Sequence, residues 1–159
     1  MSFSLAKTQT QLIAAKKVQD HCELQQVALL RCLADGAGPT IVPARPTPLA
    51  VSFEAEYAHT DTALDVEVSF HVDGEPHLVF NIDVTILLKY EMVPTFKAAE
   101  EQLLAFSDLM AIGDAWPYAR QFIQDITSRM GLPTSPLPTL RIVTQDGGKR
   151  RLSSARRSA

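Results

Sequence analysis

The sequence predicts an α+β fold in which a four-stranded antiparallel sheet is followed by two C-terminal helices. Three stretches between Val51 and Tyr90 alternate apolar and polar residues, which is the pattern of strands with one buried and one solvated face. The two stretches that follow, 95–112 and 114–130, repeat apolar residues at helical spacing. Strands that precede the helices, without alternating with them, indicate an α+β arrangement.

The N-terminal part of the chain is less regular. Residues 10–20 combine good helix formers with a narrow apolar stripe, which predicts a short helix. Residues 23–33 have a strand-like pattern and would form the first strand of the sheet. Residues 35–50 are rich in glycine and proline, which block both helix and ladder pairing. We therefore expect an extended crossover loop between the first and second strands.

The register of the last two strands can be deduced from their faces. The three alternating strands are expected at 51–57, 64–72 and 78–90. Because apolar residues of neighbouring strands must share a face, the loop 73–77 must close with odd length. We expect Val72 opposite Leu78, which places Glu67 opposite Asp83 on the solvated face.

The two helices differ in how their ends and faces are marked. The first can begin at Thr95 and end at Gly113, and it is apolar over more than one face. Such a helix is too apolar for one sheet to cover, so we expect burial between protomers of an oligomer. The second has Asp114 as N-cap, Pro117 in its first turn and Gly131 as its C-terminal stop.

Size and composition indicate one domain and no membrane span. The chain has 159 residues, and we expect a single domain over 1–143 and a flexible basic tail over 144–159. The net charge of −3 combines an acidic domain with this basic tail. No stretch reaches the roughly 18 apolar residues of a transmembrane helix. The tail lacks aromatic residues for stacking on bases, so a solubilising tail is favoured over nucleic-acid binding.

The cysteines and the N-terminus favour a cytoplasmic protein. Cys22 and Cys32 would lie about 33 Å apart along an extended segment, at ~3.3 Å per residue, beyond the reach of a disulfide. The first ten residues lack the apolar core of a signal peptide. The histidines show no metal-ligand spacing, and no nucleotide-binding or esterase motif occurs, so we expect no metal, cofactor or catalytic residues.

The second helix carries the residues through which the chain resembles a known family. Its opening is Trp116-Pro117-Tyr118-Ala119-Arg120, and its ending is Thr127-Ser-Arg-Met-Gly-Leu-Pro133. With the strands upstream, these motifs resemble SecB and, more closely, the SecB-like chaperones encoded beside toxin–antitoxin pairs. The resemblance extends, with gaps, from about Gln11 to Leu140. Trp116 and Tyr118 are interpreted mainly as packing anchors, since aromatic side chains contribute large buried areas.

The resemblance implies an ATP-independent chaperone that holds unfolded polypeptides along apolar grooves. It also implies a tetramer built as a dimer of dimers, in which first-strand edges pair. Exposed apolarity and the resemblance together suggest the groove residues Ile41, Val42, Leu87, Leu132 and Leu137. Within the family the toxin–antitoxin chaperones match better, so the client would be an antitoxin; the alternative is an export chaperone that delivers precursors to SecA.

Asp65, Glu67 and Asp83 form a predicted acidic outer face of the sheet with three interpretations. The face is simply solvated, or it is an acid–base pair, or it docks a partner. An open sheet face lacks the desolvating cleft that catalysis needs. In the SecB family this face meets SecA, and the segment around Asp83 is similar to the one that carries the docking carboxylate. Two rivals from other classes remain, a hot-dog thioesterase and an adaptor between folded proteins; the order of strands before helices disfavours the thioesterase.

Overall fold

A computed structural model of the chain describes residues 2–36, 49–74, 80–131, 137, 139–144 and 152–153. No helix among these residues has the length and apolarity that crossing a membrane requires. In chain order the elements are β1 (Ser2–Lys7), α1 (Gln9–Gln19), β2 (Cys22–Gly36), β3 (Leu49–His59), β4 (Ala63–Gly74), β5 (Phe80–Met92), α2 (Glu100–Phe106), the π-helix η1 (Ser107–Ala111), α3 (Ile112–Arg129), β6 (Thr139–Thr144) and β7 (Leu152–Ser153).

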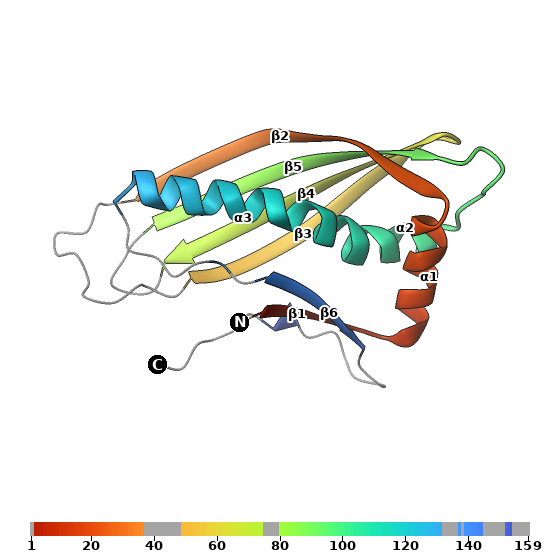
Figure 1. Ribbon diagram of the computed structural model, residues 1–159, viewed down its shortest axis with the longest axis horizontal. Helices are drawn as coiled ribbons and strands as arrows, with labels where there is room; N and C mark the ends of the chain where they lie inside the picture. Colours follow the sequence, from red (N-terminus) through yellow and green to blue (C-terminus); the bar gives the residue numbers. More distant parts are fainter. Residues whose placement is uncertain are drawn as a thin grey trace.

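The main sheet is four-stranded and antiparallel, with the order β2-β5-β4-β3. Helix α3 crosses one face of this sheet, and α1 and α2 lie at the end where β2 begins (Figure 1). The α+β fold class is therefore confirmed, and the helix expected at residues 10–20 is confirmed as α1. Thr8 caps α1 by accepting from the backbone N–H of Gln11 at 3.2 Å, and the Gln11 side chain accepts from the Thr8 N–H.

The register expected between β4 and β5 is wrong by four residues. Val72 lies opposite Ile82, and Glu67 lies opposite Leu87 instead of Asp83. The faces are nevertheless as predicted, because a shift by an even number leaves every side chain on its own face. Only the parity of the β4–β5 hairpin could be deduced from the alternation of apolar residues. The observed register also puts Asp65 opposite Lys89, an opposite-charge pair that the predicted register lacks.

The two predicted helices form one continuous helical segment. Helix α2, η1 and α3 follow one another without a break, so Gly113 does not end a helix and Asp114 is not an N-cap. A single glycine costs a helix only about 1 kcal/mol relative to alanine, and surrounding packing outweighs it. Pro117 lies inside α3 instead of in its first turn. The predicted C-terminal stop holds: α3 ends at Arg129, and Gly131 has a φ of 71°.

The core lies between the inner face of the sheet and the helices. Alternate residues of β4 and β5 are buried, and they pack against the buried side of the helical segment. Phe70 of β4 and Trp116 of α3 meet with ring centroids 5.5 Å apart, and Tyr90 of β5 meets Phe106 of α2 edge-on at 5.0 Å. Trp116 is 3% exposed. These aromatic contacts fix where the helices cross the sheet.

A second, smaller sheet was not predicted. Its order is β6-β1-β7, with β1 parallel to β6 and antiparallel to β7. The sequence predicts that the two helices are the last elements of the fold, and β6 at Thr139–Thr144 corrects that prediction. The pairing joins segments from opposite ends of the chain, and such a contact leaves no local sequence pattern. Strand β7 falls within residues 144–159, whose flexibility remains a prediction.

Replacing Tyr90 by phenylalanine should destabilise the fold by about 1–3 kcal/mol. The Tyr90 hydroxyl donates to Asp114 Oδ2 at 2.8 Å and so joins β5 to α3. Burial raises the pKa of the Asp114 carboxyl, and the hydrogen bond from Tyr90 opposes that rise. Urea unfolding at pH 7 measures the loss. Tyr118→Phe is the control, because Tyr118 is 44% exposed and the loss of stability there should stay within about 0.5 kcal/mol.

Candidate functional site

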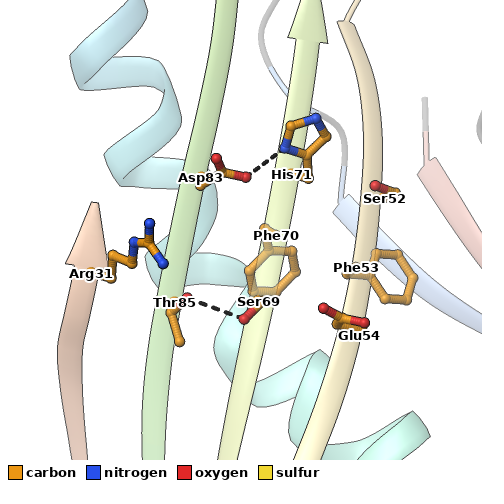
Figure 2. Close-up of a pocket in the computed structure, with 9 residues that line it drawn as sticks. All are labelled: Arg31, Ser52, Phe53, Glu54, Ser69, Phe70, His71, Asp83 and Thr85. Carbon is orange, nitrogen blue, oxygen red and sulfur yellow. Dashed lines mark hydrogen bonds and ion pairs between the residues drawn. The ribbon is translucent and has the colours of Figure 1, made fainter. Parts of the chain in front are cut away.

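The outer face of the main sheet carries a shallow cavity of about 490 Å³. Two cross-strand rows line most of it. The first row runs from Ser52 through His71 to Asp83, and the second joins Glu54, Ser69, Thr85 and Arg31. Figure 2 shows the short Ser69 and Thr85 side chains between the longer charged ones, and their hydroxyls lie 3.1 Å apart. Short side chains between long ones leave the hollow.

His71 is held between two carboxylates. Its Nδ1 lies 2.5 Å from Asp83 Oδ1, across the strands, and its Nε2 lies 3.0 Å from Asp73 Oδ1 on the same strand (Figure 2 shows the first contact). The hydrogen bond with Asp83 raises the pKa of His71, partial burial lowers it, and the charge of Asp73 raises it further. The imidazole thus links β4 to β5 most strongly when protonated.

The contribution of His71 to stability should fall with rising pH. Because its folded-state pKa is raised, the stabilisation is complete below the unfolded value of about 6.5 and is lost as the pH rises through the folded-state pKa. The side chain is 42% exposed, so we expect at most about 1 kcal/mol. Urea unfolding of wild type and His71→Gln at pH 6 and 8.5 measures this. An equal pH dependence in both proteins would contradict the assignment.

The three predicted acidic residues do not form one carboxylate cluster. Asp65 Oδ2 accepts from Lys89 Nζ at 3.1 Å, Asp83 bonds to His71, and Glu67 lies opposite Leu87. The acid–base interpretation depended on Glu67 facing Asp83, so its geometric premise is wrong. What the face offers is a mixture of carboxylates, a histidine, hydroxyls and the guanidinium of Arg31.

Neither cysteine has the surroundings of a reactive thiol. Burial raises the pKa of Cys22 to about 11, and it also raises the pKa of Cys32. Both are free thiols, and both belong to β2. Among the described residues no group of three or more His, Cys, Asp and Glu is arranged to hold a metal ion.

Exposed apolar side chains gather on β2 and on the helical segment. On β2, Leu29, Leu30 and Leu33 are 42–49% exposed, and on the helices Leu104 and Tyr118 are 47% and 44% exposed. Half-buried Phe122 and Ile126 follow Tyr118 at four-residue steps along α3, so these three share one side of the helix. Of these positions only Tyr118 was singled out from the sequence, and there it was interpreted as a packing anchor, whereas it is 44% exposed. A usable signal existed, because residues 28–30 place apolar side chains on both faces of a strand.

Of the five predicted groove residues, the structure describes only Leu87 and Leu137, and it does not bring these two together. Leu87 is half-buried on the outer face, opposite Glu67 and Ala28, whereas Leu137 is 3% exposed and belongs to the core. Ile41, Val42 and Leu132 lie outside the described residues. Of the motif residues, Trp116 is buried, Pro117 and Tyr118 are exposed and Arg120 is half-buried.

Comparison with known proteins identifies the fold through solved structures. No family model matches the chain, and no curated protein matches it. The Mycobacterium tuberculosis SecB-like chaperone Rv1957, in complex with a ChAD peptide from the HigA1 antitoxin, superposes with a TM-score of 0.74 at 20% identity, over 82% of this chain and 99% of that one. A Streptococcus agalactiae protein of unknown function gives a TM-score of only 0.45 at 10% identity, over 73% of this chain and 95% of that one, and it supports no argument. The chain therefore has the fold of a SecB-like chaperone.

Proposed function

We propose that this chain is an ATP-independent chaperone that holds unfolded polypeptides and has no catalytic centre of its own. The observation that carries the proposal is the exposure of large apolar side chains on β2, α2 and α3, on a fold whose M. tuberculosis example binds an antitoxin peptide. Holding a client without turnover requires apolar surface, but no nucleophile, metal or nucleotide site. The apolar side of α3 that starts at Tyr118 is the client surface we propose.

The chain works as a homo-oligomer in this proposal, a tetramer built as a dimer of dimers. Among the described strands, β2 pairs only with β5, and none pairs with the other edge of its 15 residues. A long edge strand with exposed leucines is unfavourable in an isolated chain, because its N–H and C=O groups and its side chains invite another strand. Pairing of β2 with β2 of a second copy would provide partners for these N–H and C=O groups and would bury the leucine side chains.

The client we propose is an aggregation-prone antitoxin segment, in the cytoplasm. This rests on the M. tuberculosis relative, whose bound peptide comes from an antitoxin. The outer face with Asp65, Glu67 and Asp83 remains a proposed docking surface for a partner protein. Its cavity is the observation that favours the export alternative, in which that partner is SecA.

The test is suppression of light scattering by an aggregating unfolded protein, without ATP and at increasing protomer ratio. The mass in solution is measured beside it, with a tetramer expected at four times the 17.5 kDa of one chain. Suppression near one assembly per client supports the proposal. Absence of suppression by a correctly folded tetramer would refute it and favour an adaptor. Co-purification from the native host then separates the alternatives: an antitoxin supports the first, and SecA with secretory precursors supports the second.

A further inference from the structure

Leu137 and β6, which together we name the strap, follow α3 in the chain and contribute apolar side chains to the core. Leu137 is 3% exposed, and Leu140 at the start of β6 packs partly buried against the same core cluster. Strand β6 also contacts α3, the helix on which we place the client surface. Leu137 and Leu140 therefore place apolar side chains from an extended backbone on an apolar surface. An unfolded client would make the same kind of contact.

Among the described residues, no strand of the main sheet pairs with the strap. Strand β6 pairs with β1 from Ser2–Thr139 to Lys7–Thr144, and β1 pairs on its other side with two residues of β7. Figure 1 shows this small sheet lying apart from the four-stranded sheet, past β3. Parallel pairing is slightly weaker per residue than antiparallel pairing, and a sheet this small is marginal without further packing. The strap can thus open while the main sheet stays folded.

We propose that the strap is a displaceable cover of apolar core surface that adjoins the client surface of α3, and that an incoming client takes its place. This inference rests on the chaperone function proposed above. Opening the strap uncovers the core surface beneath Leu137 and Leu140, beside α3, and an extended apolar client segment takes their place. If the strap is open for about a tenth of the time, client affinity is about tenfold weaker than that of the uncovered protein.

A disulfide between the strap and β1 tests this directly. Ser4 and Arg141 are register partners, and directly opposed strand residues are close enough for a disulfide. Ser4→Cys and Arg141→Cys are introduced together after Cys22→Ala and Cys32→Ala, so that only one pair can form. The probe is fluorescent, reduced and carboxymethylated lactalbumin. Oxidised protein should bind it at least about tenfold more weakly than the same protein after reduction. Equal affinities would overturn the proposal.

A second variant opens the strap, so that the test does not depend on the crosslink. Arg141→Pro with Ile142→Pro breaks the β1–β6 ladder, because successive N–H groups alternate in direction and one of the two must face β1. Binding should tighten by up to about tenfold. Unchanged or weaker binding of the probe, with the main sheet intact by circular dichroism, would contradict the proposal that the strap is a displaceable cover.

Failure of the proposed chaperone function can be distinguished from failure of the proposed displaceable strap. If wild-type, locked and opened proteins all leave the probe unbound, the chaperone function itself is refuted. Hydrogen exchange reports on the strap alone: the amides of Ser2–Lys7 and Thr139–Thr144 should exchange faster than those of β4 and β5, and the oxidised lock should slow them. Equal protection of both sheets would overturn the displaceable cover even if the chaperone function holds.

Discussion

Replacing Phe70 by alanine is expected to lower the free energy of unfolding by about 3–5 kcal/mol, the largest stability effect of any prediction here. Phe70 is 1% exposed, and its ring lies 5.5 Å from Trp116 and 6.0 Å from Phe53 by ring centroids. The substitution removes the contact that ties the middle of β4 to α3 and leaves a cavity that the surrounding backbone cannot close. Urea unfolding, followed by the fluorescence of Trp116, the only tryptophan, measures the loss.

The matched control for Phe70→Ala is Ile13→Ala on α1. Ile13 is 53% exposed and does not belong to the β2 edge, so its truncation removes little buried apolar surface and should cost well under about 1.5 kcal/mol. A loss at Phe70 no greater than the loss at Ile13 would show that packing of the helical segment on the sheet does not depend on the contact between Phe70 and Trp116.

A double substitution of Leu104→Glu and Tyr118→Glu should abolish most client holding while leaving the fold intact. Each side chain offers a client apolar area that is worth about 1.5–3 kcal/mol when fully buried, and about 1.4 kcal/mol is already a tenfold change in affinity. Because both residues are 44–47% exposed and glutamate suits helices, we expect unfolding to change by less than about 1 kcal/mol. Aggregation suppression at increasing protomer ratio measures the effect.

The control for that variant adds the same two charges elsewhere on the same helix. Gln121→Glu with Ser128→Glu places them at exposed polar positions of α3, and suppression should be as in wild type. If both double variants lose activity equally, net charge and not apolar contact governs holding. If neither loses it, the client surface lies elsewhere, with the leucines of β2 as the next candidates.

Local patterns predicted the main sheet because its strands bury one face. In β4 and β5 every second residue is apolar, so the strands, their faces and the parity of their hairpin could be deduced. The register itself could not, because sliding by an even number keeps the faces and is decided by cross-strand pairs such as His71 with Asp83. The acid–base interpretation of the candidate site was wrong for the same reason, because it depended on Glu67 lying opposite Asp83.

Features without a local signature were missed. Gly113, Asp114 and Pro117 are residues typical of the boundary between two helices. The helix nevertheless continues through them, because packing against the sheet outweighs these local preferences. Strands β1 and β6 depend on each other across almost the whole chain, and neither short segment predicts its partner. For the candidate client surface, helical spacing shows that the apolar residues of 114–130 share a face, but it does not show how much of that face the sheet covers; Phe122 and Ile126 are left half-buried.

The two bulges of β2 limit what its open edge can become. Between Leu24 and Gln26, and again between Leu29 and Arg31, β2 carries one extra residue against β5. Each bulge twists the strand and interrupts its outer row of N–H and C=O groups. A strand added to this edge can therefore pair in register only over short stretches. Repeated edge-to-edge addition of further copies into a continuous sheet is disfavoured. For the chaperone function that we propose, this is an advantage, because the edge is kept from seeding fibres of the protein itself.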